Sequence, residues 1–196
     1  MSKSFKKLLN GNEIFKSRYQ EKMEKLKSSQ SPKVMVVSCC DSRIDPSLML
    51  QCEPGDLFIV RNVANIIPPY EKDDKSHGTS AALEFAIKHL KIKDLVILGH
   101  SDCGGMKAFV NGNIGANDFI SNWVSLFEGI KTCTCINKAV KTGLQKSYEN
   151  CFNFPWIKEA VEKGELEIHR AFFDIESLKL ECFSTSENKF VDAQDY

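Results

Sequence analysis

Two short segments of the sequence carry side chains that could bind a metal ion. Cys39 is followed by Asp41 and Arg43, and further along the chain His100 is followed three residues later by Cys103. Thiolate and imidazole groups are ligands that suit zinc. The carboxylate and the guanidinium place two charged groups beside them. These five residues are therefore the first candidates for a functional site.

The number of possible ligands indicates a catalytic rather than a structural metal. His100 and Cys103 are three residues apart, so a turn entering a helix can aim both at one point, and Cys39 completes a set of two thiolates and one imidazole. A structural zinc normally has four protein ligands, whereas three leave one position open for water or substrate. The alternative is that both cysteines are ordinary buried thiols and the histidine is a hydrogen-bonded turn residue.

The apolar pattern predicts the elements that would position these residues. Continuous apolar runs at residues 34–37, 57–60 and 95–98 predict strands buried on both faces of a parallel sheet, and apolar positions at helical spacing predict a helix over Gly78 to Leu90. The first and third runs end just before the two ligand-bearing segments. Because ligands bind at the carboxyl ends of strands in open α/β sheets, we expect the two segments to converge there.

The rest of the chain predicts helices at its start and strands at its end. Residues 1–30 favour two helices separated by Gly11-Asn12, residues 117–164 are mainly helical with Pro155 as a helix start, and residues 166–173 and 178–183 resemble two strands joined by a polar turn.

The predicted fold class is therefore α/β. We expect a single domain with a mostly parallel central β-sheet flanked by helices, an N-terminal helical arm and a possible antiparallel edge strand. The arm would span residues 1–30 and the main domain residues 31–196.

Composition and charge argue against several classes of partner. The 196 residues are 42% hydrophobic with a formal net charge of +0, which favours neither nucleic acid nor a membrane. No apolar run approaches the ~20 residues of a membrane span. Residues 1–33 hold nine Lys or Arg against three Glu, which is typical of a solvated amphipathic helix. The acidic residues and the lack of an apolar signal region predict a cytoplasmic protein with reduced thiols.

The two ligand-bearing segments resemble the paired signature of β-class carbonic anhydrases, with features of the plant-type branch. The match covers roughly residues 30–108 and includes Cys39-x-Asp41-Ser42-Arg43, Gly55-Asp56, Arg61-Asn62-Val63-Ala64-Asn65, residues 78–84, and Gly99-His100-Ser101-x-Cys103-Gly104-Gly105-x-Lys107-Ala108. The resemblance implies a carbonate dehydratase, a zinc-dependent lyase that interconverts CO₂ and bicarbonate with release of a proton. It also implies one Zn²⁺ per subunit, held by Cys39, His100 and Cys103.

The same resemblance gives Asp41 and Arg43 catalytic roles. Hydrating CO₂ at neutral pH needs a hydroxide, which zinc supplies by lowering the pKa of a bound water. Asp41 would accept a hydrogen bond from that hydroxide and orient it, while Arg43 would keep the carboxylate from occupying the open position on the metal. The two side chains lie on one side of the chain if the segment is extended. An ordinary loop salt bridge is the alternative.

The substrate pocket is expected to combine an amide with an apolar wall. By resemblance to the plant-type branch, Gln30 would donate to a bicarbonate oxygen and Phe58 and Val63 would line the wall. Phe85 stands where plant-type members often carry Tyr, so one hydroxyl contact is missing while the wall remains. Taken alone, Gln30 is more often a surface residue.

Two other functions stay open from the sequence. A hydrolase of COS or CS₂ would use the same scaffold and metal site, and a non-catalytic zinc-stabilised binding protein would use Asp41 as a permanent fourth ligand. The resemblance also implies a homodimer or higher homo-oligomer in which the N-terminal helices reach across to the neighbour, with CO₂ or bicarbonate as the small-molecule partner.

Other potential ligands are predicted to bind no metal. Cys133-x-Cys135 has no histidine near it in sequence. His77, His89 and His169 are expected to be structural or solvent-facing, with His77 as the one candidate for a proton shuttle.

Overall fold

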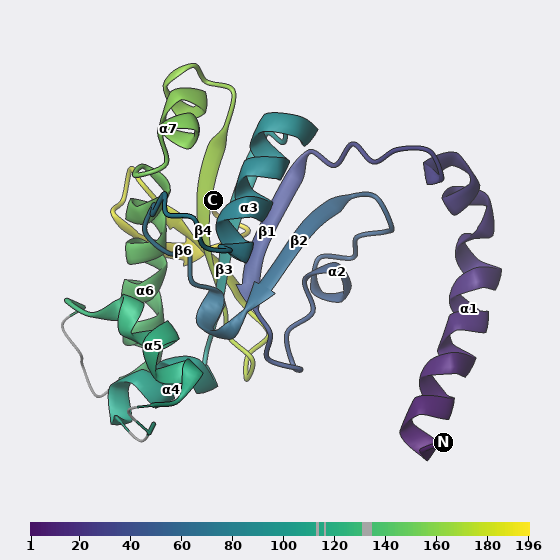
Figure 1. Cartoon of the computed structure of the whole chain (residues 1–196), viewed down its shortest axis with the longest axis horizontal. Coiled ribbons are helices and arrows are strands. Elements are labelled where there is room, and N and C mark those ends of the chain that lie inside the picture. The colour runs from purple at the N-terminus through teal and green to yellow at the C-terminus, as the bar shows by residue number, and fades with distance from the viewer. Residues whose placement is uncertain (113, 116, 131–134) are drawn as a thin grey trace.

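A six-stranded mixed sheet forms the centre of the computed structural model, which describes residues 1–112, 114–115, 117–130 and 135–196 (Figure 1). Its strand order is β2-β1-β3-β4-β5-β6, with the first four strands parallel and the last two added antiparallel. The strands are β1 (Val34–Cys39), β2 (Leu57–Asn62), β3 (Asp94–His100), β4 (Glu167–Phe173), β5 (Leu180–Ser184) and β6 (Lys189–Asp192). The predicted α/β class with an antiparallel edge is confirmed.

Helices surround this sheet, except for the first, which stands apart from it in Figure 1. They are α1 (Lys3–Leu26), α2 (Pro46–Met49), η1 (Val63–Asn65), α3 (Gly78–Glu84), η2 (Phe85–Leu90), α4 (Gly104–Asn111), α5 (Phe119–Val124), η3 (Ser125–Phe127), α6 (Ile136–Cys151) and α7 (Pro155–Glu162). As predicted, α7 begins at Pro155. None of the described helices is long and apolar enough to cross a membrane.

β1 and β3 are buried on both faces, as their continuous apolar runs predicted, whereas β2 is an edge strand whose residues 57–60 are only partly buried. Met35, Val37 and Cys39 of β1 belong to the main core, which includes residues of η2 and α6. The alternate residue Val36 packs with Leu98 on the opposite face, in a smaller cluster that includes part of α2. Successive side chains of a strand point to opposite faces. Cys39 therefore faces the side of the sheet that carries the main core.

The N-terminal segment forms one helix where two were expected. α1 runs through Gly11 to Leu26, and Ser2 caps it by accepting a hydrogen bond from the Phe5 backbone N–H at 3.2 Å. A glycine inside a helix costs only about 1 kcal/mol relative to alanine. The helix-favouring residues on either side outweigh that cost, so the predicted break was wrong.

Two local features differ from the pattern-based expectation. The helix over residues 78–90 changes at Phe85 into a wider π-helical segment, η2. At the other end of the chain, β6 adds an edge strand of four residues that pairs with β5. Four residues are too few for a periodic pattern to stand out from the surrounding turn residues.

Gly99 lies where α6 packs directly on β3. An added Cβ at this position would come within 2.8 Å of Val140 Cγ1 and 3.2 Å of Leu144 Cδ1, both on α6. We predict that Gly99→Ala lowers the free energy of unfolding by about 1–3 kcal/mol, because α6 must move away from the sheet. Urea denaturation measures this change.

Gly11→Ala is the matched control. A Cβ at Gly11 would meet nothing within 4 Å, and alanine favours the helix, so this variant should match or exceed the wild-type stability. An unchanged unfolding free energy for Gly99→Ala would contradict the close packing of α6 on β3.

Candidate metal centre

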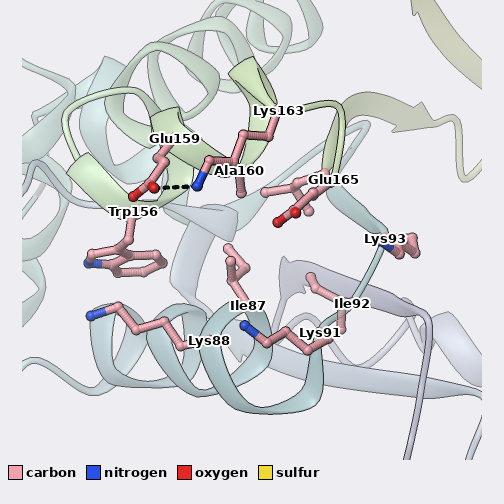
Figure 2. A pocket seen from close by; sticks show the side chains of 11 residues that line it. Ile87, Lys88, Lys91, Ile92, Lys93, Trp156, Glu159, Ala160, Lys163 and Glu165 are labelled. Carbon is pink, nitrogen blue, oxygen red and sulfur yellow. Dashed lines mark hydrogen bonds and ion pairs between the residues drawn. The ribbon is translucent and has the colours of Figure 1, made fainter.

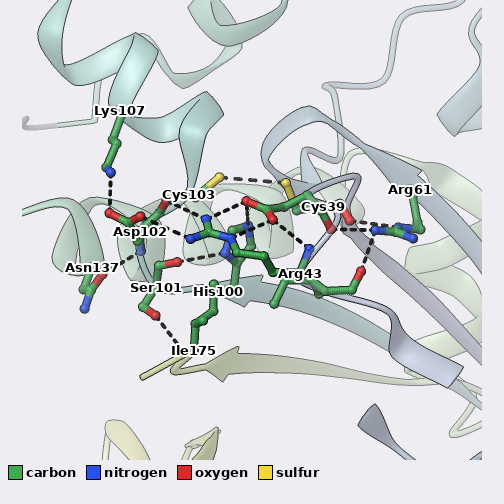
Figure 3. A network of polar contacts seen from close by, with 12 residues as sticks. Cys39, Arg43, Arg61, His100, Ser101, Asp102, Cys103, Lys107, Asn137 and Ile175 are labelled. Carbon is green, nitrogen blue, oxygen red and sulfur yellow. Dashed lines mark hydrogen bonds and ion pairs between the residues drawn. The ribbon is translucent and has the colours of Figure 1, made fainter. Parts of the chain in front are cut away.

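The three predicted metal ligands converge at the carboxyl ends of neighbouring strands. β1 and β3 are parallel neighbours, so Cys39 at the end of β1 lies near His100 at the end of β3, and Cys103 follows at the start of α4. Their ligand atoms lie within 4.8 Å of one another, with the two Sγ atoms 3.9 Å apart (Figure 3). All three residues are buried.

His100 is oriented so that one ring nitrogen is left for a metal. Nδ1 lies 2.8 Å from the Ser101 carbonyl oxygen, which can only accept, so Nδ1 donates and Nε2 carries the lone pair. Nε2 is buried without a hydrogen-bond partner among the described residues. A buried unsatisfied acceptor is costly, and metal-ligating histidines commonly hold their other nitrogen in this way. This nitrogen and the two thiols fit a zinc ion.

The two thiols perturb each other because they are close and buried. A hydrogen bond from Cys103 is the main cause that lowers the pKa of Cys39, and the same contact, together with burial, raises the pKa of Cys103. A second negative charge 3.9 Å from the first would be unfavourable without a cation. A bound divalent ion would remove this conflict, since it deprotonates a coordinating thiol.

Asp41 lies next to the buried ligands and is clamped by Arg43. Nε and Nη2 of Arg43 donate to Oδ1 and Oδ2 of Asp41 at 3.0 and 2.8 Å, and the Arg43 backbone N–H donates to Oδ1 at 3.0 Å. The hydrogen bonds from the Arg43 side chain are the main reason that the pKa of Asp41 lies well below its usual range. Oδ2 lies 4.0 Å from His100 Nε2. An ionised carboxylate therefore stands beside the ligand set.

Arg61 holds the segment between Cys39 and Ile44, a role that the sequence analysis missed. Its Nε donates to the Cys39 carbonyl oxygen at 3.0 Å, and its Nη2 donates to the carbonyl oxygens of Asp41, at 2.8 Å, and Ile44. Arg61 lies in a stretch of sequence that resembles the family, and that resemblance was the signal that could have identified it. The carbonyl contacts themselves depend on the path of the loop, which no sequence pattern gives.

The four predicted pocket residues lie in two places. Val63 directly follows β2, at the carboxyl end of the strands, and a Cβ added to Gly105 would come within 2.5 Å of its Cγ1. Phe58 and Phe85 pack together with ring centroids 6.0 Å apart, near the amino end of β2. Gln30 is exposed and precedes β1. In a single chain, the structure therefore places Gln30, Phe58 and Phe85 away from the metal ligands.

A separate hollow of about 230 Å³ lies between η2 and α7 (Figure 2). Ile92 and Leu166 line it, and because they precede β3 and β4 the hollow is at the amino ends of these strands. The described residues around it include lysines, glutamates and Trp156 but no cysteine or histidine. It offers no soft metal ligands, so it is not an alternative metal centre.

The structure describes His77 and His169 but not Cys133, so these predictions have different outcomes. His77 Nε2 lies 2.5 Å from Asp73 Oδ1, and His169 Nε2 lies 3.0 Å from Asp94 Oδ1, in partly exposed pairs. Both geometries suit ordinary ion pairs. Cys133 lies outside the described residues, so the expectation that Cys133-x-Cys135 binds no metal stays a prediction.

The chain is similar to known carbonic anhydrases over most of its length. A family model described as carbonic anhydrase matches residues 34–180. Two curated relatives from Arabidopsis thaliana are similar: beta carbonic anhydrase 5, chloroplastic, is 35% identical over 81% of this chain, and beta carbonic anhydrase 6, mitochondrial, is 32% identical over 89%. The aligned regions span only 58% and 65% of those two proteins.

Solved structures resemble the chain over nearly its whole length. The β-carbonic anhydrase CcaA has a TM-score of 0.90 at 28% identity and covers 98% of this chain and 93% of its own. A β-carbonic anhydrase from Sordaria macrospora, one of two described as tetrameric, has a TM-score of 0.82 at 26% identity, covering 93% and 98%. The six-stranded sheet and its helices therefore follow a known arrangement.

Replacing one thiol tests the ligand set. We predict that Cys103→Ser reduces the zinc content of the purified protein from about one ion per chain to a small fraction of that, because a hydroxyl replaces a soft thiolate. Elemental analysis measures the stoichiometry. Cys182→Ser, on β5 and outside the cluster, is the control and should keep its zinc. Undiminished zinc in Cys103→Ser would remove Cys103 from the ligand set.

Proposed function

The chain belongs to the β-carbonic anhydrase family, and on this basis we propose that it is a carbonate dehydratase, a zinc lyase that interconverts CO₂ and bicarbonate with release of a proton. The observation that carries the proposal is the buried Cys₂His set, in which His100 Nε2 has no partner among the residues that the structure describes and a clamped carboxylate lies 4.0 Å from it. Because the chain spans less than two thirds of its curated relatives, the activity is inferred for this chain rather than transferred from them.

Cys39, His100 and Cys103 would hold the zinc ion. Two thiolates and one imidazole form a donor set that suits zinc, and three protein ligands are typical of a catalytic site with one open position. When bound, zinc acts as a Lewis acid that makes water a nucleophile near neutral pH. Two thiolates offset its formal charge, which weakens this effect and makes the surrounding polar groups more important.

Asp41 and Arg43 would supply that polar support. Asp41 is held ionised, so it can accept a hydrogen bond from the attacking water oxygen and fix its direction toward the CO₂ carbon. Arg43 donates to both oxygens of Asp41 and thereby restrains the carboxylate. Asp41 would therefore orient the nucleophile, and Arg43 would keep the Asp41 carboxylate out of unproductive positions.

The contacts of Arg43 support a catalytic site over a permanently closed zinc site. A carboxylate that served as a fixed fourth ligand would turn one oxygen to the metal, and a two-pronged clamp on both oxygens would oppose that. A COS or CS₂ hydrolase would use the same groups, so it differs in access to the site rather than in the metal centre.

We predict that Asp41→Asn lowers kcat/KM for CO₂ hydration about 100-fold, because the amide cannot replace a charged acceptor. Its zinc content should remain near that of the wild type. Asp195→Asn, an exposed position near the C-terminus, is the matched control and should keep full activity. Stopped-flow hydration assays measure the rates.

Two results would contradict the proposal. An unchanged rate in Asp41→Asn would show that this carboxylate has no part in the chemistry. Zinc-loaded wild-type protein that released sulfide from CS₂ but hydrated no CO₂ above buffer would replace the proposed reaction with the hydrolase.

We also propose a homodimer or higher homo-oligomer, with residues 1–30 as an arm and residues 31–196 as the catalytic domain. α1 has no buried residue and exposes large apolar side chains, among them Leu8 and Phe15. Such an apolar surface on a helix is typical of a contact with another subunit. One solved relative is described as tetrameric, which agrees with this assembly.

The separation of the pocket residues supports the same assembly. Gln30, Phe58 and Phe85 lie toward the amino ends of the strands, whereas the metal ligands lie at the carboxyl ends. If these three residues line a substrate pocket, they would serve the metal centre of a neighbouring copy. The predicted pocket would then be complete only in the oligomer.

Adding charged side chains to the apolar face of α1 tests whether this face lies between subunits. We predict that Leu8→Glu combined with Phe15→Glu lowers the native mass, because two charges would have to be buried between subunits. Light scattering after size-exclusion chromatography measures that mass. Lys16→Glu on the same helix is the control for helix charge and should keep the wild-type mass. A wild-type protein that is a monomer at assay concentration would contradict the proposal.

The cytoplasmic location expected from the sequence stays a prediction. The two curated relatives carry names that place them in the chloroplast and the mitochondrion. Cell fractionation with an antibody to the chain would decide between these compartments.

A further inference from the structure

Arg43 is held between two aspartates that come from different strand ends. One edge of its guanidinium clamps Asp41, while Nη1 lies 3.4 Å from Asp102 Oδ2 and Nη2 lies 3.4 Å from the Asp102 carbonyl oxygen (Figure 3). Asp102 lies between the ligands His100 and Cys103. Arg43 therefore links the segment after β1 to the segment after β3.

Across this link, Asp102 is anchored to two helices. Its backbone N–H donates to Asn137 Oδ1 of α6 at 3.2 Å, and Lys107 of α4 donates to its carboxylate. The preceding Ser101 is fixed by hydrogen bonds to the segment that ends β4, with Ser101 N–H donating to the Phe173 carbonyl oxygen at 2.9 Å. The Arg43 side chain is 46% exposed and the Asp102 side chain 54% exposed, so these hydrogen bonds and the ion pair, rather than burial, hold Asp102 in place.

A long arginine side chain loses considerable rotamer freedom when it is fixed, and a single partner holds it less firmly than two partners on different edges of the guanidinium. Asp41 is the group whose position has to be fixed, because its Oδ2 lies only 4.0 Å from His100 Nε2, the nitrogen left for a metal. Asp102, tied to α4 and α6, offers an anchor that does not move with Asp41.

We propose that Asp102 is a positioning residue that holds Arg43 in the orientation that keeps Asp41 away from the metal's open position. This inference rests on the proposed metal centre. Lys107 offsets part of the Asp102 charge, so that Asp102 steadies the guanidinium without displacing Asp41 from it. The alternative is that Asp102 forms only an exposed ion pair with Lys107, and such pairs contribute little.

The test is anion affinity at the open position in cobalt-substituted protein. Azide is the probe, and its binding is followed by visible absorption of the Co²⁺ site. We expect Asp102→Asn to weaken azide binding about tenfold, because a loosened Arg43 lets Asp41 compete for the metal. kcat/KM of the zinc enzyme should fall by a similar factor. Asparagine tolerates the positive φ of 60° at this position, so the backbone is preserved.

Two further variants separate positioning from general damage. In an Asp41→Asn background, Asp102→Asn should leave azide affinity unchanged, because the competing carboxylate is gone. Lys107→Met removes the tie between Asp102 and α4 but leaves the Arg43 contacts and the Asn137 hydrogen bond, so it should weaken azide binding less than Asp102→Asn does. Equal weakening by Lys107→Met, or equal weakening by Asp102→Asn with and without Asp41, would overturn the inference.

The outcomes also distinguish this inference from the proposed function. If the wild type bound Co²⁺ without thiolate-to-cobalt absorption, the proposed metal centre itself would be wrong. If that absorption is present and Asp102→Asn binds azide as the wild type does, only the role of Asp102 is rejected.

Discussion

Parallel pairing of β1 with β3 brings together the ends of two strands that are far apart in the sequence. The register sets Ser38 opposite Leu98, so the chain leaves both strands at one edge of the sheet, with Cys39 next to the turn that carries His100 and Cys103. Because side chains alternate between faces, a slip of one residue would turn Cys39 away from the main core. The ligand set depends on this register.

The groups around the buried ligands are organised by two arginines. Arg61 reaches from β2 to backbone carbonyl oxygens of the segment that follows Cys39, and Arg43 within that segment clamps Asp41. An arginine presents five donors in a fixed plane, so each can hold several acceptors at once. The loop after β1 is thereby fixed by charge-assisted hydrogen bonds, while the ligands beneath it are fixed by burial.

The two ends of the sheet carry different parts of the proposed enzyme. The metal ligands, Asp41 and Val63 lie at the carboxyl ends, and Gln30 and Phe58 lie toward the amino ends. A single chain therefore holds a complete ligand set but not the complete predicted pocket. The exposed apolar side chains of α1 fit the same interpretation, since a second copy would both cover them and bring its own pocket residues into reach.

The sequence by itself determined the three parallel strands nearest its start, the α/β class and the convergence of Cys39 with His100 and Cys103. These follow from local signals, because continuous apolar runs mark buried strands and the ligands directly follow them. The sequence pattern wrongly predicted a helix break at Gly11, because a helix can tolerate a single glycine. It did not reveal β6, because a strand of four residues has too few positions to show a period. Only the tertiary structure decided the contacts of Arg61 and Asp102 and the distance of Gln30 from the ligands. Such contacts depend on the path of the loop backbone, and that path is set by packing rather than by the spacing of residues along the chain.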